Sequence, residues 1–288
     1  MSSAATWTRG DSLYSRVPVA KRKRPEERLE RAAQWLLEAH ARRERFQPLP
    51  AELAPRSLGE AYAIQDDFVA LRAQSLGAIA GYKIALSTPA MQKFVGVDAP
   101  QAGTLLESTL RRSPARVRAA DYVRLIVEFE IGVRIASDLP AADAPFTRSR
   151  VLESVGGVMP ALELADDRGA DYAQLARHPL HLIADNSWNE GAVLGAEIPG
   201  WRAIDLAAVR GVAWLNGERT GEGTGADALG HPLDAVAWMG DHLASLGRGL
   251  LRGDVVITGS LVASLNVKPG DAVRFELEGL GSAELQVD

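Results

Sequence analysis

VEFEIGV, residues 127–133, places two carboxylates inside a run of strand-forming apolar residues. Side chains i and i+2 of a strand point to the same face, so Glu128 and Glu130 are expected to stand side by side. Two like charges at that separation are unfavourable unless a cation lies between them. The stretch therefore predicts a strand that carries a candidate cation site on one of its faces.

The spacing of this pair also fits a second interpretation, in which Glu128 and Glu130 are hydrated carboxylates at a solvent-facing strand edge. Against it, Ile126 lies on the same face as the two carboxylates, so that face is not simply polar. The opposite face is continuously apolar and must be buried; it consists of Leu125, Val127, Phe129, Ile131 and Val133. This pattern favours a strand in the interior of the fold.

A third carboxylate, Glu163, lies in the next apolar run, residues 160–164. Three carboxylates with water completing the shell suit a hard cation such as Mg²⁺, Mn²⁺ or Ca²⁺ better than Zn²⁺. The sequence predicts such a site if Glu163 meets the other two, and spacing along the chain leaves that meeting open.

The composition describes a chain of 288 residues, 47% of them hydrophobic, which is enough to bury a sizeable core. It contains no cysteine, which excludes disulfides, thiolate metal sites and a cysteine nucleophile and fits a reducing cytoplasm. No apolar run approaches the roughly 20 residues needed to cross a membrane, and no early segment is typical of a signal peptide. The net charge of −5 argues against nucleic acid as the main partner. We expect a cytoplasmic protein without membrane or nucleic-acid partners.

One basic cluster, residues 21–24, departs from this balance. Such a cluster is typical of a localisation signal or a nucleic-acid-binding arm. The alternative, which we favour, is that residues 1–24 form a solvated, disordered extension.

Helical spacing dominates residues 25–80, which we expect to form a helical N-terminal portion. Apolar residues recur three and four apart in residues 25–47. Ser57 followed by Glu60 is typical of a capping box, which opens a second helix.

Residues 81–288 have the pattern of a mixed, strand-rich domain, so the predicted fold class is α+β. We expect a short strand at 81–86, ended by Thr88-Pro89, and a two-residue hairpin turn within 214–219. A helix is predicted at 232–246, and further strands are predicted at 121–136, 158–165, 253–259 and 273–277.

The sequence gives weaker support to the other candidate functional residues than to the three glutamates. Lys83 is either a surface lysine or a partly buried amine near an anionic substrate, where it acts in acid–base chemistry. His178 and His181 are three residues apart without an evident third ligand, so we interpret them as structural. The glycine-rich residues 221–225 follow a hairpin rather than a strand–turn–helix unit, which excludes a nucleotide-binding loop. No serine-hydrolase elbow is present.

An ordered series of short motifs resembles the 2-keto-4-pentenoate hydratase branch of the fumarylacetoacetate hydrolase superfamily. The motifs run in the family's order from about residue 28 to the C-terminus: GYKI (81–84), GVD (96–98), GTL (103–105), VEFE (127–130), LE (162–163), DN (185–186), AVAW (235–238), GDVVITGS (253–260), PGD (269–271) and EGLGS (278–282).

The resemblance implies a mixed β-sheet roll preceded by helices, a homo-oligomer, and a Mg²⁺ or Mn²⁺ ion held by Glu128, Glu130 and Glu163. It also places Lys83 in the active site and implies hydration of a short 2-hydroxy-dienoic or 2-oxo acid from the degradation of aromatic compounds. A 2-oxo acid can chelate such an ion through its carboxylate and keto oxygens.

Further site residues follow from the same likeness. Thr258, Gly259 and Ser260, closing a strand, are expected to donate hydrogen bonds to the substrate carboxylate. Asp185 is expected to be a catalytic residue and Asn186 a substrate-binding residue, and the two orient water or brace the site, with a local loop-capping role as the alternative.

The chain departs from the family pattern at several positions. Gln101 stands where relatives usually carry an acidic residue, Ala85 where glycine is frequent, and Trp188 where small residues are common. The loss of the acid removes a possible proton-transfer partner, and Trp188 is expected to reshape the pocket. A 4-oxalocrotonate-type decarboxylase or a C–C hydrolase are therefore alternatives within the superfamily, and a non-catalytic metal-binding module is an alternative outside it.

Overall fold

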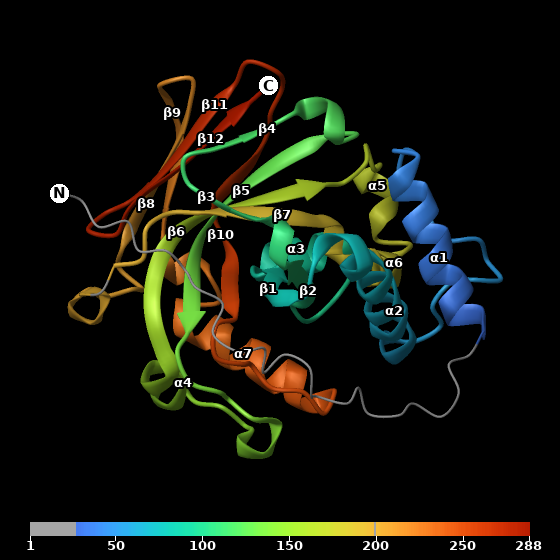
Figure 1. Ribbon diagram of the computed structural model, residues 1–288, viewed down its shortest axis with the longest axis horizontal. Helices are drawn as coiled ribbons and strands as arrows, with labels where there is room; N and C mark the ends of the chain where they lie inside the picture. The colour runs from blue at the N-terminus through green and yellow to red at the C-terminus, as the bar shows by residue number, and fades with distance from the viewer. Residues whose placement is uncertain (1–26, 199) are drawn as a thin grey trace.

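The computed structural model describes residues 27–198 and 200–288, so the expected basic extension of residues 1–24 lies outside the described residues. A seven-stranded sheet and a five-stranded sheet pack together; the helix at residues 232–245 lies against the larger sheet, and the helices at residues 27–41 and 58–76 lie together at one side of the molecule (Figure 1). This architecture confirms the predicted α+β class, a mixed β-sheet roll preceded by helices. Within the described ranges, none of the helices combines the length and apolar character that crossing a bilayer requires.

The larger sheet has the strand order β2-β1-β10-β5-β6-β7-β3. Its strands are β1 (Ile79–Ala85), β2 (Gln101–Leu106), β3 (Leu110–Arg112), β5 (Leu125–Ile135), β6 (Val155–Asp166), β7 (Asn189–Leu194) and β10 (Val255–Asn266). The smaller sheet, in the order β4-β12-β11-β8-β9, consists of β4 (Ala115–Val117), β8 (Arg210–Leu215), β9 (Glu218–Thr224), β11 (Ala272–Leu277) and β12 (Gly281–Val287). Parallel pairs (β1 with β10, β3 with β7, β4 with β12) make both sheets mixed.

The α-helices are α1 (Glu27–Ala41), α2 (Leu58–Leu76), α3 (Pro89–Val95), α4 (Arg148–Ser154), α5 (Tyr172–Leu175), α6 (Pro179–Ala184) and α7 (Pro232–Ser245). The helices α1 and α2 pack on each other and share a small hydrophobic core with Ala184 at the end of α6. The division of the chain at residue 80 stays a prediction.

The main hydrophobic core lies between the two sheets. The odd-numbered residues of β5 from Leu125 to Ile135 are fully buried in it, and Phe129 meets Phe275 of β11 with ring centroids 5.5 Å apart. Because strand side chains alternate, the even-numbered residues of β5 are directed to the opposite, inner face of the larger sheet. That inner face carries Glu128 and Glu130.

The larger sheet curls around its inner face. Strands β2 and β7 are in contact although β1, β10, β5 and β6 stand between them in the strand order. Strand β10 pairs with β5 through repeated register shifts between Ile257 and Leu265, and such bulges bend a strand. At Gly81 an added Cβ would lie 1.9 Å from the Val255 carbonyl oxygen, so the close approach of β1 and β10 requires glycine.

Several predicted elements are confirmed and others are wrong at their ends. Ser57 caps α2 as predicted, and Asn216 and Gly217, both with positive φ, make the two-residue hairpin turn. The first helix ends at Ala41 instead of residue 47, because Arg43 adopts a left-handed conformation (φ 51°). The short strand predicted at residues 81–86 is β1, which ends at Ala85; Thr88 and Pro89 follow it and begin α3, with Thr88 as the N-cap.

Two strand predictions also need correction. The strand predicted at residues 121–136 begins at Leu125, because the backbone N–H groups of Val123 and Arg124 donate to Asp166 instead of to a strand ladder. The strand predicted to end near residue 259 continues to Asn266 as β10. Thr258, Gly259 and Ser260 therefore lie inside a strand and do not close one.

Candidate metal centre and active site

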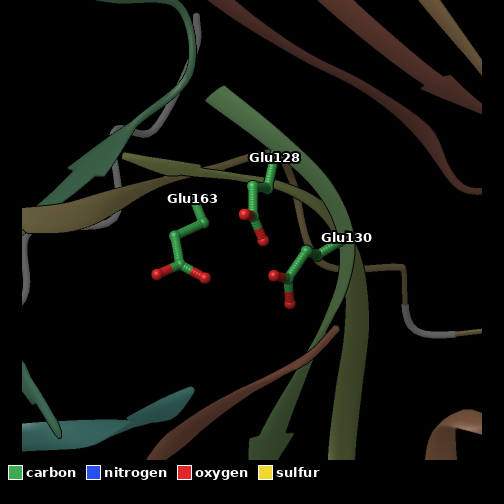
Figure 2. A group of neighbouring side chains, drawn as sticks. All are labelled: Glu128, Glu130 and Glu163. Atoms are coloured by element: carbon green, nitrogen blue, oxygen red, sulfur yellow. The ribbon is translucent and has the colours of Figure 1, made fainter. Parts of the chain in front are cut away.

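The three glutamates meet on the inner face of the roll. Glu128 and Glu163 stand directly opposite each other in the antiparallel pairing of β5 and β6, and Glu130 is two residues further along β5. Each residue offers a carboxylate oxygen within 4.8 Å of the others, and Figure 2 shows the carboxylates directed into one space. Glu130 and Glu163 are fully buried and Glu128 is half-buried. The interpretation of the pair as a solvent-facing strand edge is therefore wrong.

Lys83 lies at the edge of this cluster. Its Nζ is 3.0 Å from Oε1 of Glu163, and the lysine is only 3% exposed, so the surface-lysine interpretation is wrong. The same Glu163 oxygen accepts a hydrogen bond of 2.9 Å from Nδ2 of Asn189. Gly103 stands opposite Lys83 on β2, where an added Cβ would lie 3.0 Å from the lysine Cγ. The missing side chain leaves room for the lysine.

The ion pair between Lys83 and Glu163 depends on the curl of the sheet. Strands β1 and β6 are separated by β10 and β5, which on a flat sheet means about 14 Å with the side chains pointing in parallel. The observed contact of 3.0 Å requires that the two strands face each other across the inner space.

Burial and mutual repulsion dominate the electrostatics of the cluster. Burial, followed by the Glu163 charge, raises the pKa of Glu128 to about 7. The same two causes raise the pKa of Glu130 well above its usual value. Burial by itself lowers the pKa of Lys83, but the charges of Glu163, Glu128 and Glu130 outweigh it, and the net pKa is raised. Lys83 is therefore held in the charged form.

The donor set fits a divalent cation. Oε1 of Glu130 and Oε2 of Glu163 are buried without a hydrogen-bond partner among the described residues. Burial and mutual repulsion raise the pKa of Glu128 and Glu130, and a cation bound between these carboxylates would relieve that repulsion. Convergent carboxylate oxygens are the ligands that Mg²⁺, Mn²⁺ and Ca²⁺ prefer.

The three residues expected to bind the substrate carboxylate make hydrogen bonds within the protein. The Gly259 N–H donates to Oε2 of Glu130 at 2.6 Å, and the Thr258 hydroxyl donates to the Ile131 carbonyl. The Ser260 hydroxyl donates to the Val262 carbonyl and accepts from the Phe129 N–H. Gly259 thus orients a candidate metal ligand. Substrate binding by these residues stays a prediction.

Asn186 lies against β2 next to the inner-face residue Gly103, and Asp185 does not join the glutamate cluster. Asn186 uses both ends of its side-chain amide on the backbone of Thr104 in β2. Asp185 is ion-paired with Arg168 and His40. Burial by itself raises the pKa of Asp185, but these two cations outweigh it and hold the pKa below its usual value. These contacts agree with the bracing role, and the catalytic role stays a prediction.

The sequence analysis missed a buried network of charges behind this segment. The His40 ring spans it, with Nε2 2.6 Å from Asp185 and Nδ1 3.2 Å from Glu190, and Glu190 also pairs with Arg72. Burial lowers the pKa of His40, but Asp185 and Glu190 outweigh this effect and raise it to about 9. His40 follows the same three- and four-residue spacing as the apolar residues of the first helix. Only the fact that it is a histidine could have indicated a functional residue there.

The segment Asn186–Trp188 that this network brackets is left-handed at three consecutive non-glycine residues, with φ of 51°, 47° and 60°. Such conformations are costly and persist where their surroundings hold them. The Trp188 ring packs edge-on against Phe46 and Tyr172 in a separate hydrophobic cluster. His181, by contrast, accepts a hydrogen bond from the Leu49 N–H, which agrees with its structural interpretation.

Comparison with known proteins adds the family. Residues 73–288 match the family described as Fumarylacetoacetate (FAA) hydrolase C-terminal. The 2-keto-4-pentenoate hydratase of Paraburkholderia phymatum is 33% identical over 255 residues, which cover 88% of this chain and 95% of that protein. The 2-keto-4-pentenoate hydratase of Burkholderia vietnamiensis is 34% identical over 222 residues, covering 77% and 83% respectively.

A solved structure agrees with these relatives. The 4-oxalocrotonate decarboxylase from Pseudomonas putida G7, complexed with magnesium and adipate, has a TM-score of 0.83 at 25% identity. The match covers 91% of this chain and 98% of that one. These findings confirm the resemblance inferred from the ordered motifs. The chain belongs to the fumarylacetoacetate hydrolase C-terminal family.

Proposed function

We propose that this protein is a divalent-metal-dependent lyase that hydrates a short 2-hydroxy-dienoic or 2-oxo-enoic acid in the degradation of aromatic compounds. The observation that carries the proposal is the buried convergence of Glu128, Glu130 and Glu163, with Lys83 beside them. Similarity to two 2-keto-4-pentenoate hydratases supports the reaction type.

The three glutamates would hold a Mg²⁺ or Mn²⁺ ion, which when bound supplies Lewis-acid stabilisation for negative charge on a substrate oxygen. The buried, charged Lys83 would bind the substrate carboxylate or deliver a proton while the double bond shifts. Asp185, whose carboxylate is already shared between Arg168 and His40, would act through the backbone by holding Asn186 in place. In this division of roles, Gly259 orients Glu130 through its N–H group.

The second candidate activity is decarboxylation of a 4-oxalocrotonate-type acid, which the structural similarity to the Pseudomonas putida decarboxylase favours. A C–C hydrolase and a non-catalytic metal-binding module remain as further alternatives. A cytoplasmic location and a homo-oligomer are part of the proposal; light scattering after gel filtration measures the second.

Incubation with Mg²⁺ and either 2-hydroxypenta-2,4-dienoate or 4-oxalocrotonate separates these activities. We expect loss of the dienol absorbance without release of carbon dioxide. Carbon dioxide formed from 4-oxalocrotonate would instead establish the decarboxylase. Metal-dependent ligand binding without any turnover would favour the non-catalytic module. The Glu130→Gln variant serves as the control for background reaction.

A further inference from the structure

Gln101 opens strand β2 on the same face as Lys83. In the antiparallel pairing of β1 and β2, Lys83 stands opposite Gly103 and Ala85 stands opposite Gln101. Opposite residues, and residues two apart on one strand, share a face. The alternating positions Tyr82, Ile84 and Ala102 belong to the main hydrophobic core on the other face. The Gln101 side chain is therefore directed to the inner space of the roll.

Within that space Gln101 lies on the polar side. The next inner-face residue of β2 beyond Gly103 is Leu105, which belongs to an apolar cluster with Val255, Ile257 and Met159. Moving along β1 and β2 from Leu105 to Gln101 passes Lys83, which contacts Glu163. Gln101 thus stands one residue pair beyond Lys83, on the side away from the apolar cluster.

The Gln101 amide is buried and unused. The residue is 2% exposed, and neither its Nε2 nor its Oε1 has a hydrogen-bond partner among the described residues. A buried glutamine does not have to lack hydrogen-bond partners, as a second glutamine shows. Gln65 of α2, 3% exposed, donates from Nε2 to the carbonyls of both Ala102 and Ile183. A buried donor and acceptor without partners are unfavourable unless a ligand satisfies them.

We propose that the Gln101 amide is a specificity-determining group that hydrogen-bonds the uncharged oxygen that hydration adds to the substrate chain, beyond the 2-oxo acid end. This inference rests on the proposed function, which places the 2-oxo acid end at the glutamates and Lys83. An amide offers both N–H donors and a carbonyl acceptor without charge, which matches a hydroxyl group on a short 2-oxo acid. It does not compensate the charge of a second carboxylate, whose burial needs a cation.

The ligand class that follows is a 2-oxo acid with a hydroxyl on its chain, the kind of compound that hydration of a 2-oxo-enoic acid produces. Three ligands of similar length separate the possibilities: 4-hydroxy-2-oxopentanoate, 2-oxopentanoate, which lacks the hydroxyl, and 2-oxopentanedioate, which carries a second carboxylate. Oxalate, which has no chain, measures binding of the metal-chelating 2-oxo acid end alone. Binding is measured by calorimetry with Mn²⁺ present.

We expect the wild-type protein to bind 4-hydroxy-2-oxopentanoate roughly 10–100-fold more tightly than either analogue. The first analogue, 2-oxopentanoate, leaves the buried amide unpaired, and 2-oxopentanedioate buries a second carboxylate whose charge the amide does not compensate. Gln101→Leu removes both hydrogen-bonding groups and should abolish this preference while oxalate binding stays unchanged. Retention of the preference in Gln101→Leu would overturn the inference. Failure of wild type to bind oxalate and all three acids would contradict the proposed function instead.

Thermal unfolding without metal or ligand tests whether the amide has a purely structural role. Gln101→Leu should keep the wild-type unfolding temperature or raise it, since the amide bonds nothing in the protein. The matched variant Gln65→Leu should unfold at a lower temperature, because two buried carbonyls lose their donor. A drop for Gln101→Leu as large as that for Gln65→Leu would show that Gln101 is a scaffold residue and overturn the inference.

Discussion

Glu130 is subject to two opposing influences. Its carboxylate is fully buried beside two others, and burial together with the neighbouring charges raises its pKa well above the usual value. At the same time its Oε2 accepts the Gly259 N–H, while Oε1 has no partner among the described residues. A carboxylate with one oxygen anchored and the other unpaired is poised to ligate a cation.

Replacing Glu130 with glutamine should separate metal binding from folding. The amide oxygen can still accept from Gly259, and the raised pKa of Glu130 already favours a neutral side chain in the metal-free protein. We therefore expect the fold and its metal-free stability to be kept. The Mn²⁺ affinity should fall by more than the roughly 10–100-fold that loss of an outer partner costs. Calorimetric titration measures it, with the exposed Glu153→Gln as control. Equal affinities in the two variants would remove Glu130 from the ligand set.

At the scale of elements, helix α1 stabilises a strained segment that is distant in sequence. Asp185 and Glu190 flank the left-handed residues Asn186–Trp188, and the His40 ring contacts both flanks. Asn189, which lies between Asp185 and Glu190 in the sequence, donates a hydrogen bond to Glu163. The N-terminal helix therefore helps to fix the geometry of a candidate metal ligand through β7, although none of its own residues belongs to the glutamate cluster.

Removing the His40 charge should destabilise the protein in a pH-dependent way. The folded-state pKa of about 9 lies above the unfolded value near 6.5, so the stabilisation is complete below about pH 6.5 and is lost as the pH rises through 9. We expect His40→Gln to cost about 1.5–3 kcal/mol at pH 6 and progressively less towards pH 9.5. Urea unfolding at pH 6, 7.5 and 9.5 measures the difference; a difference independent of pH would contradict a charged His40.

At the scale of the whole molecule, the curl of the larger sheet creates the site. If the sheet were flat, Lys83 on β1 and Glu163 on β6 would lie on separate parts of one surface. The five-stranded sheet packs on the outer face of the larger sheet and supports its curl. There Phe275 contacts Phe129, the residue between Glu128 and Glu130 in sequence. Ligands that bridge β5, β6 and β1 should therefore stabilise the closed roll as a unit.

Mn²⁺ with oxalate, a mimic of the 2-oxo acid end, should raise the unfolding temperature. Saturation at about 100 times the dissociation constant contributes about 2.7 kcal/mol, which corresponds to roughly 5–10 °C for a domain of this size. Differential scanning calorimetry compares four conditions: EDTA, EDTA with oxalate, Mn²⁺, and Mn²⁺ with oxalate. Oxalate should have no effect in EDTA. An equal oxalate shift in EDTA would place the anion elsewhere in the molecule.

Local features were accessible from the residues alone because their causes are local. The alternation of Val127–Val133 indicated a half-apolar strand, Ser57 and Glu60 indicated a helix start, and Asn216-Gly217 indicated a hairpin turn. The residue pattern also indicated the three glutamates as candidate ligands of a hard cation, and the ordered motifs led to the family. Where a boundary prediction failed, as at Arg43, a left-handed residue that spacing does not reveal had ended the helix.

Only the tertiary structure brought distant residues together. Register places Glu163 opposite Glu128, and the curl brings Lys83 to Glu163. The side chain of His40, spaced like its apolar neighbours along one helix, reaches charges about 150 residues away. These contacts are set by strand pairing and sheet curvature, which arise from the packing of the whole chain, and no window of sequence contains them.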